Sequence, residues 1–446
     1  MRGKLLRHGR LDELTIDQAL DRCLASDRAI VRDEVPFPGR VVTNVNVLAF
    51  LKPSPRVFMT IRAFLPAKGR DLRLDLFRGL ANWAIFLDHV PNNAVAWLTT
   101  RNYGFSDAAD IFVFISGYTA AFVYAKSMLV QGFVAGTARL LKRVWQLYIA
   151  HVLLFVFYIA AIGWVAEAYN HSHLVDEFNV AGVIDRPMLT LMQGLLLKFK
   201  PLNLDVLPLY IVLMAAFPLV LWLMLRRPDL AIASALVLYF AARQFGWNLP
   251  AYPSGVWYFN PFTWQLLFVL GAWSALGGAS RLQRFIRSPA IVSICFVYLG
   301  FALLMTVAGY VGPLGKLIPE GLLGAFNPSD KTNLAPYRVL HFVALAVLVV
   351  RFLPFGWPGL TSRWLRPLII CGQRSLEVFC VGVFLSFVGH FLLELVSDSL
   401  LAQIIVSVSG IALMTAVAYY RSWSKDLDKQ PAASKSSSES VSTSVS

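Results

Sequence analysis

The sequence predicts an all-α, polytopic membrane protein with about ten transmembrane helices and both termini in the cytoplasm. Of its 446 residues, 57% are hydrophobic and 15% are charged, and the mean hydropathy is +0.60. Soluble domains contain roughly 45–50% apolar and about 25% charged residues. A net charge of +14 is also found in nucleic-acid-binding proteins, but here the cations gather in short connectors between apolar runs. That distribution is typical of membrane topology and argues against a nucleic-acid partner.

Ten apolar windows have roughly the 20-residue length that an α-helix needs to cross a lipid bilayer. They are 72–92, 107–129, 145–166, 206–225, 230–245, 261–278, 290–312, 337–356, 367–393 and 400–420. The fifth window is short. The run 188–199 is predicted to be a surface helix rather than a span.

The connectors between these windows alternate between basic and less basic segments, and the positive-inside rule places the basic set in the cytoplasm. The basic set contains Lys126, Arg139, Lys142, Arg143, Arg226, Arg227, Arg281, Arg284, Arg287, Arg363 and Arg366. Ten spans then return the chain to the cytoplasm. We therefore expect a cytoplasmic N-terminal extension at 1–70, a membrane domain at 71–421, and a cytoplasmic tail at 422–446. The Ser-rich composition of that tail predicts disorder.

The first window carries Arg78 and His89 inside the apolar run LDLFRGLANWAIFLDHV. Ionisable groups are costly in a membrane and usually serve a pathway or a reaction. Eleven residues at 100° per residue come within about 20° of three full turns, so both side chains share one helix face, roughly 16 Å apart. The predicted orientation puts Arg78 in the inner half and His89 in the outer half. The structural alternative is that Arg78 extends to the interface while His89 caps a packed core.

Carboxylates flank both residues. Asp75 lies three positions before Arg78 and is expected to pair with it along the helix. Asp88 adjoins His89, which is the best general-base candidate in the membrane region because imidazole titrates near neutral pH.

The second window begins with polar residues that suit a helix N-terminus. Ser106 is a natural N-cap, and Asp107 and Asp110 fall in the first turn, where the helix dipole favours acids. A role in starting the helix is enough to explain why both carboxylates are present. The alternative is that they bind a substrate. The Ser116–Gly117 step lets another helix, or a slim substrate, approach closely.

Two further groups of charged residues lie near the predicted cytoplasmic face. Arg139, Lys142 and Arg143 precede the third window. They serve either as a topology signal or as a cradle for phosphates, since clusters of Arg and Lys bind such anions strongly. In the ninth window, Arg374 and Glu377 are three residues apart. They either pair with each other or contact a polar group of a ligand.

The loop 167–205 contains His171, His173, Asp176 and Glu177. Two histidines with nearby acids are able to hold a metal, but this spacing is weak evidence, and a solvated loop with no metal is the favoured interpretation. The sequence also lacks a Walker A loop, a G-x-S-x-G elbow, an HExxH motif and a dinucleotide-binding fingerprint. No tightly bound cofactor is therefore expected.

Several of these segments resemble the acyltransferase-3 superfamily of ten-span membrane enzymes. The first window resembles the superfamily's first-span motif, in which an Arg and a His are separated by ten residues. FVFISGY resembles its second-span signature, and ARLLKRVWQLY resembles its basic segment, with Gln146 where Pro is usual. LDVLPLYIVLMAAFP, YFNPFTWQLLFVLGA and CGQRSLEVF are similar to the OpgC-type branch. The resemblance covers about residues 70–420.

The resemblance implies a bacterial inner-membrane enzyme that moves a succinyl group from a cytoplasmic acyl-CoA, succinyl-CoA, to hydroxyls of periplasmic glucans. His89 would deprotonate the sugar hydroxyl, with Asp88 orienting the imidazole, and Arg78 would complete the functional pair. The candidate substrate-binding residues are Asp75, Asp107, Asp110, Ser116, Arg139, Lys142, Arg143, Arg374 and Glu377.

Two alternative functions stay open at this point. One is the same chemistry with another acyl group or acceptor, such as acetyl transfer to a surface polysaccharide. The other is a proton-coupled transporter that uses Arg78, His89 and the nearby acids as a relay. Transporters more often show internal repeats and broken helices at matching places, and the sequence shows no such repeat.

Overall fold

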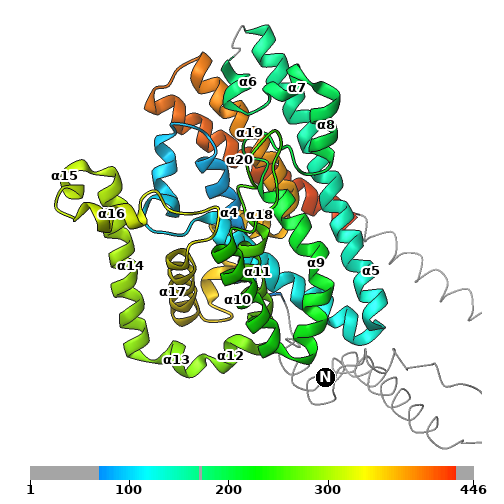
Figure 1. Ribbon diagram of the computed structural model, residues 1–446, viewed down its shortest axis with the longest axis vertical. Helices are drawn as coiled ribbons and strands as arrows, with labels where there is room; N and C mark the ends of the chain where they lie inside the picture. The colour runs from blue at the N-terminus through cyan, green and yellow to red at the C-terminus, as the bar shows by residue number, and fades with distance from the viewer. Residues whose placement is uncertain (1–69, 170–172, 428–446) are drawn as a thin grey trace, which may run out of the picture. The chain divides into compact units, whose positions relative to one another are not determined.

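The computed structural model describes residues 70–169 and 173–427, and within them the chain is all-α (Figure 1). Their only strand-like pairing is a single bridge between Pro250 and Val256. The predicted N-terminal extension, apart from Arg70, and the tail beyond residue 427 lie outside the described residues.

The longer helices are α4 (Leu72–Asp88), α5 (Ala108–Ala168), α9 (Val206–Arg226), α10 (Pro228–Phe245), α11 (Pro261–Trp273), α14 (Pro289–Tyr310), α17 (Pro336–Phe352), α18 (Arg366–Gln373), α19 (Ser375–Leu395) and α20 (Leu400–Leu427). The shorter helices are α6 (His173–Glu177), α7 (Ala181–Asp185), α8 (Pro187–Leu195), α12 (Ala279–Arg281), α13 (Gln283–Arg287), α15 (Gly312–Gly315) and α16 (Glu320–Phe326). Single turns of 3₁₀ or π helix cover η1 (Ala94–Leu98), η2 (Thr100–Asn102), η3 (Ser274–Gly278) and η4 (Pro358–Thr361).

Six helices of the described residues are long and apolar enough to cross a membrane. They are α5, α9, the continuous segment Pro261–Arg281, α14, α19 and α20. The protein is therefore a membrane protein, and each of the ten predicted windows lies largely on helix. Because α4 and α17 have 17 residues each, just under the usual span, the count of ten and the cytoplasmic termini stay predictions. The run 188–199 forms the short helix α8, which has nine residues.

The second and third predicted windows both fall on α5, a helix of 61 residues that bends at Gly132. Gly132 has φ 85° and ψ 170°, a backbone conformation that side-chain-bearing residues rarely adopt. The bend brings the two arms together, since Gly136 packs directly against Met128. The connector predicted between these windows is thus itself helical.

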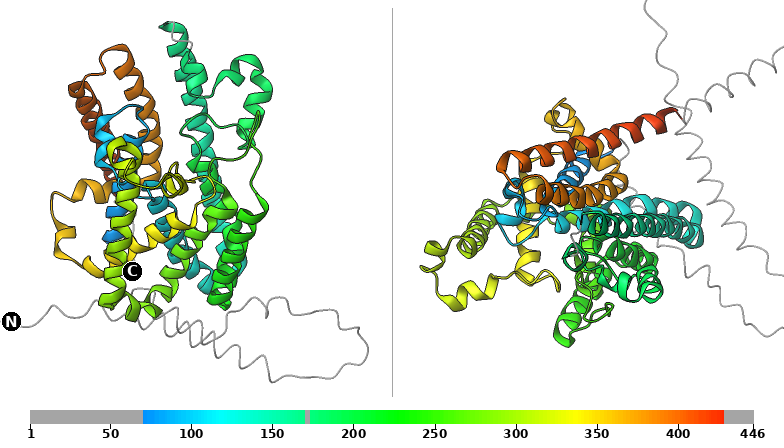
Figure 2. Two further views of the ribbon diagram at one scale, coloured as in Figure 1. Left: turned by 60° about the vertical axis from the view of Figure 1, so that its left-hand side comes forward. Right: turned by 90° about the horizontal axis from the view of Figure 1, so that it is seen from above.

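Helix α4 is held among α5, α18, α19 and α20 (Figures 1 and 2). Its crossing with α18 is backbone against backbone: a Cβ added at Gly79 would collide with the carbonyl of Leu368. A Cβ added at Gly372 would likewise collide with the carbonyl of Asp75. Small residues allow such close packing of membrane helices. The crossing fixes the part of α4 that carries Arg78.

Apolar packing surrounds this helix on two sides. The main core joins α5, α9 and α11 around fully buried large side chains such as Tyr158, Phe217 and Trp264. A second cluster around Phe86 and Met414 joins α4 to α19 and α20. Polar groups that enter this part of the molecule are therefore held in a largely apolar setting.

Candidate active site

Two cavities lie along α4, one at its C-terminal end and one beside Arg78 near its middle. The larger has a volume of about 820 Å³ and is lined by His89 together with residues of the α4–α5 connector, the start of α9, and loops near 258 and 330. The smaller has a volume of about 170 Å³ and is lined by Arg78 with residues of α5, α9 and α19. Adjacent residues at the start of α9, Val206 and Leu207, line the larger and the smaller cavity respectively. One helix therefore presents an imidazole to one cavity and a guanidinium to the other.

His89 is the C-terminal cap residue of α4, and its backbone N–H donates to the carbonyl of Ile85 over 3.1 Å. Its side chain is half-buried, and Nδ1 has no hydrogen-bond partner among the described residues. The ring is thus held by packing at the cavity wall rather than by a bond to a neighbouring side chain. An imidazole in this setting is able to accept a proton from a ligand in the larger cavity.

Asp88 is paired elsewhere, which corrects the expectation that it orients the His89 ring. Its Oδ1 accepts a hydrogen bond of 2.6 Å from the Thr99 hydroxyl, and its backbone carbonyl accepts one of 3.1 Å from Arg101. Successive residues of a helix point about 100° apart, so a carboxylate beside the histidine in sequence faces a different direction. Asp88 still lines the larger cavity.

Arg78 reaches across to α5, where its Nη2 donates to the carbonyl of Ile115 over 3.1 Å and to Thr119 Oγ1 over 2.9 Å. The expected pairing with Asp75 does not form. Asp75 instead accepts two bonds of 2.5 and 2.7 Å from Arg70, because it faces the α18 crossing while Arg78 faces α5. The Nε of Arg78 has no partner among the described residues. Part of its donor capacity therefore stays available to a ligand.

Of the predicted basic cluster, the structure places Arg143 in the lining of the smaller cavity, together with Ser116. Arg139 and Lys142 are exposed and do not line it. The close approach expected beside Ser116 is confirmed, because a Cβ at Gly117 would collide with the carbonyl of Phe268 on α11.

Asp107 and Asp110 begin α5 as expected, but the N-cap is Asp107 rather than Ser106. Asp107 accepts from the backbone of Ala109, and Asp110 accepts from the backbone of Asp107, which completes a capping box. Ser106 instead lies 2.7 Å from Nδ1 of His341 on α17. Because the Ser106 hydroxyl is bound to another helix, it does not cap α5, and the N-cap is the next residue, Asp107.

The same two carboxylates form a buried ion-pair network with cations from distant segments. Arg338 of α17 lies 2.6 Å from Asp110 and 3.3 Å from Asp107, and Lys331 lies 2.7 Å from Asp107. Asp110 is fully buried and does not line the cavity, whereas Asp107, Lys331 and Arg338 do. Asp110 thus supports the wall of the larger cavity instead of contacting a ligand.

Sequence reasoning missed several polar residues of the larger cavity, namely Arg101, Asp205, Lys331 and Arg338. Burial raises the pKa of the Asp205 carboxyl to about 6, and Lys200 opposes that shift. Such a perturbed carboxyl in a cavity is typical of functional sites. An Arg inside the eighth window was a detectable signal for Arg338. Asp205 falls inside the OpgC-type segment LDVLPLYIVLMAAFP, whereas Arg101 and Lys331 lie in polar connectors, where nothing in the sequence distinguishes them.

Arg374 and Glu377 line neither cavity, although Ser375 and Leu376 between them line the smaller one, and they do not pair with each other. Arg374 donates to the Ser422 hydroxyl over 3.0 Å, and Glu377 lies 3.6 Å from Arg421. The chain breaks its helix at Arg374, with φ −112° and ψ 36°, which removes the helical register that the expected pairing required. Both residues instead connect α19 to α20.

The sequence model of a protein family described as "OpgC protein" matches residues 70–426. The match covers every described helix apart from the last residue of α20. No curated protein matches the chain.

Proposed function

The chain belongs to the OpgC protein family, and from that membership we propose that it is a membrane acyltransferase that modifies periplasmic glucans. In the finer form of the proposal, it moves a succinyl group from a cytoplasmic acyl-CoA to a glucan hydroxyl across the bacterial inner membrane. The observation that carries the proposal is the pair of cavities along α4, one with His89 at the end of the helix and one with Arg78 near its middle. Transfer between two compartments needs such an arrangement, because donor and acceptor arrive from opposite sides.

The larger cavity suits a carbohydrate acceptor. Its lining combines aromatic rings, which cover the apolar faces of sugars, with side chains that exchange hydrogen bonds with hydroxyls. These residues include Phe105, Asn203, Tyr258, Phe259, Tyr310, Phe326 and Asn327. His89 takes the proton of one hydroxyl as its oxygen attacks the thioester carbonyl. The carbon–sulfur bond then breaks, and the CoA thiolate leaves and recovers a proton.

The smaller cavity suits the pantetheine arm of the donor, and the thioester would have to extend past Arg78 to react beside His89. At about 170 Å³ it admits a slender thioester arm, while a nucleotide would have to stay outside. Arg78 presents guanidinium donors at a position where they can bind the amide oxygens of that arm. Arg143 lines the same cavity, and the exposed Arg139 and Lys142 on the same helix are available to phosphates.

Replacing Arg78 by Lys is expected to raise the apparent KM for the acyl donor by roughly 10-fold, with the acceptor KM changed little. The guanidinium of Arg78 binds Ile115 and Thr119 and still has donors left for a ligand. Lysine keeps the charge but lacks this planar group with several donors. Steady-state kinetics with each substrate varied in turn measures the two constants. Lys126→Gln is the matched control, because Lys126 is an exposed cation of α5 outside the cavity lining. An unchanged donor KM in Arg78→Lys would reject a donor site here.

Deleting the protein is expected to remove succinyl groups from periplasmic glucans. Each succinyl half-ester carries a carboxylate with a pKa near 4, so unmodified glucans should elute earlier from an anion exchanger and lose about 100 mass units per substituent. Mass spectrometry is the decisive measurement, since other charged substituents also affect elution. Loss of acetyl groups from a surface polysaccharide would instead favour the other acyltransferase, and no changed product would favour a transporter.

A further inference from the structure

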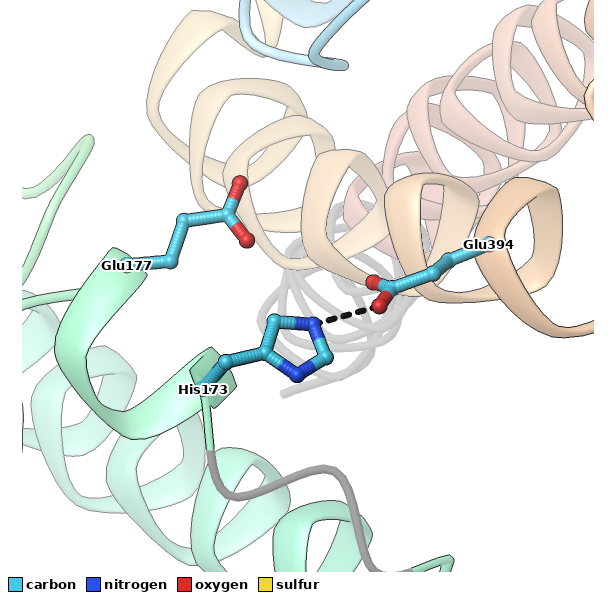
Figure 3. A group of neighbouring side chains, drawn as sticks. All are labelled: His173, Glu177 and Glu394. Carbon is cyan, nitrogen blue, oxygen red and sulfur yellow. Dashed lines mark hydrogen bonds and ion pairs between the residues drawn. The ribbon is translucent and has the colours of Figure 1, made fainter.

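Two histidines and two glutamates meet where α6 packs against the end of α19, outside both cavities. These residues, His173, Glu177, His390 and Glu394, are called here the histidine–glutamate cluster. Each helix contributes a His and a Glu four positions apart, which places both side chains on one helix face. Figure 3 shows three of them pointing toward a common centre, with His173 and Glu177 from α6 and Glu394 from α19. His171, the other histidine of the loop, lies outside the described residues.

The ligand atoms of this cluster lie close together, and small movements of the side chains would let them share one metal ion. His173, Glu177 and Glu394 each offer one ligand atom, and these atoms lie within 4.8 Å of one another. Nε2 of His390 lies 3.2 Å from Glu177 Oε1 and 3.5 Å from Glu394 Oε2. Tetrahedral Zn²⁺ with bonds of 2.0–2.1 Å holds its ligands about 3.3 Å apart. The 2.5 Å contact between His173 Nε2 and Glu394 Oε1 has to lengthen by about 0.8 Å to fit the same geometry.

His390 supplies an independent indication of a ligand. Its side chain is 11% exposed, and among the described residues Nε2 has no hydrogen-bond partner although it lies near two carboxylates. The ring is positioned by packing against Phe178, with the ring centres 5.6 Å apart. A buried nitrogen normally has a hydrogen-bond partner. Here the nitrogen lies near two carboxylate oxygens without such a bond to any described residue, and a cation bound by all three atoms would satisfy it.

We propose that the histidine–glutamate cluster binds a divalent transition-metal ion, with Zn²⁺ as the best match. Two imidazoles and two carboxylates provide four ligands of kinds that Zn²⁺ binds, and four protein ligands fill a tetrahedral site. The ion would join α6, in the loop predicted to be periplasmic, to the C-terminal end of α19. Its role would be structural, since the four residues line neither cavity.

The test uses purified full-length protein in detergent, with any affinity tag removed and metal stripped by a chelator. After equilibration with zinc sulfate and desalting, metal content is measured by mass spectrometry. Wild type should retain about one Zn²⁺ per chain. Glu177→Gln/Glu394→Gln should lower zinc affinity by more than the roughly 10- to 100-fold that loss of an outer-shell partner costs. Glu167→Gln, an exposed carboxylate outside the cluster, is the matched control and should bind zinc as wild type does.

No zinc in wild type, or equal zinc in wild type and the double variant, would overturn the proposal. If the double variant does not fold, Co²⁺ bound to wild type decides the matter. Intense visible absorption typical of tetrahedral Co²⁺ supports the site, and the weak spectrum of six-coordinate Co²⁺ rejects it. These readouts do not depend on acyl transfer, so they stand whatever reaction the protein catalyses.

Discussion

Replacing His89 by Gln is expected to reduce acyl transfer by about 10²- to 10⁴-fold, the usual contribution of a general base. The imidazole lines the larger cavity and its Nδ1 has no internal partner, so its removal takes away a proton acceptor while little else changes. Transfer is measured with purified protein, an acyl donor and a glucan, at saturating and at limiting acceptor. The loss should appear mainly in kcat, because the proton moves in the transition state.

The control for this variant is His151→Gln. His151 is another histidine in an apolar helix, fully buried in α5, and it lines neither cavity. If loss of any buried imidazole disturbs the protein, both variants lose activity together. Gel filtration and thermal unfolding should show His89→Gln to be folded. Activity of His89→Gln within a few-fold of wild type would show that His89 is not the base.

Replacing Arg338 by Met is expected to lower the free energy of unfolding by about 3–5 kcal/mol, as typically follows when one partner of a buried ion pair is removed. Arg338 and Asp110 are 4% and 0% exposed, and their charged atoms lie 2.6 Å apart. Without the guanidinium, the Asp110 carboxylate is left in an apolar setting. Thermal or denaturant unfolding in detergent measures the change.

A second substitution separates this effect from simple loss of packing. Arg338→Met combined with Asp110→Asn should be more stable than Arg338→Met alone, because the stranded charge is removed. Arg281→Met is the matched control: Arg281 pairs with Asp229 at 2.6 Å, but its side chain is 49% exposed. Exposed pairs contribute at most about 1 kcal/mol. Equal destabilisation by Arg281→Met and Arg338→Met would contradict the prediction that breaking a buried ion pair costs more than breaking an exposed one.

The sequence predicted the helices well because apolar length and helical periodicity are local properties. Each apolar window lies largely on helix, and Arg78 and His89 lie on one helix with a cavity at each. Two spans joined by a connector were predicted for 107–166, but the connector is itself helical and the change of direction is confined to Gly132. A positive φ at this glycine depends on what the two arms of the helix pack against, which the local sequence does not specify.

The partners of the charged residues were predicted poorly, because each had several acceptable neighbours in sequence. Asp75 pairs with Arg70 rather than Arg78, and Asp88 with Thr99 rather than His89. The tertiary packing of α4 decides which of the neighbouring groups becomes the partner. The spacing of residues along one helix carries no information about that packing. Asp205 lies in the OpgC-type segment LDVLPLYIVLMAAFP but was not predicted as a site residue, because its cavity is assembled from segments far apart in the chain.

The crossing of α4 and α18 divides the catalytic helix into a rigid part and an adjustable part. Arg78 adjoins Gly79, where the two backbones touch, so the backbone that carries the guanidinium cannot shift without displacing α18. His89 lies at the helix terminus, and its Nδ1 is tied to no other group of the described residues. On the proposed mechanism, the enzyme would be strict about its acyl donor yet tolerant of the position of the attacking hydroxyl. A polymer with many nearly equivalent hydroxyls could then be substituted at more than one of them without any change in how the donor is held.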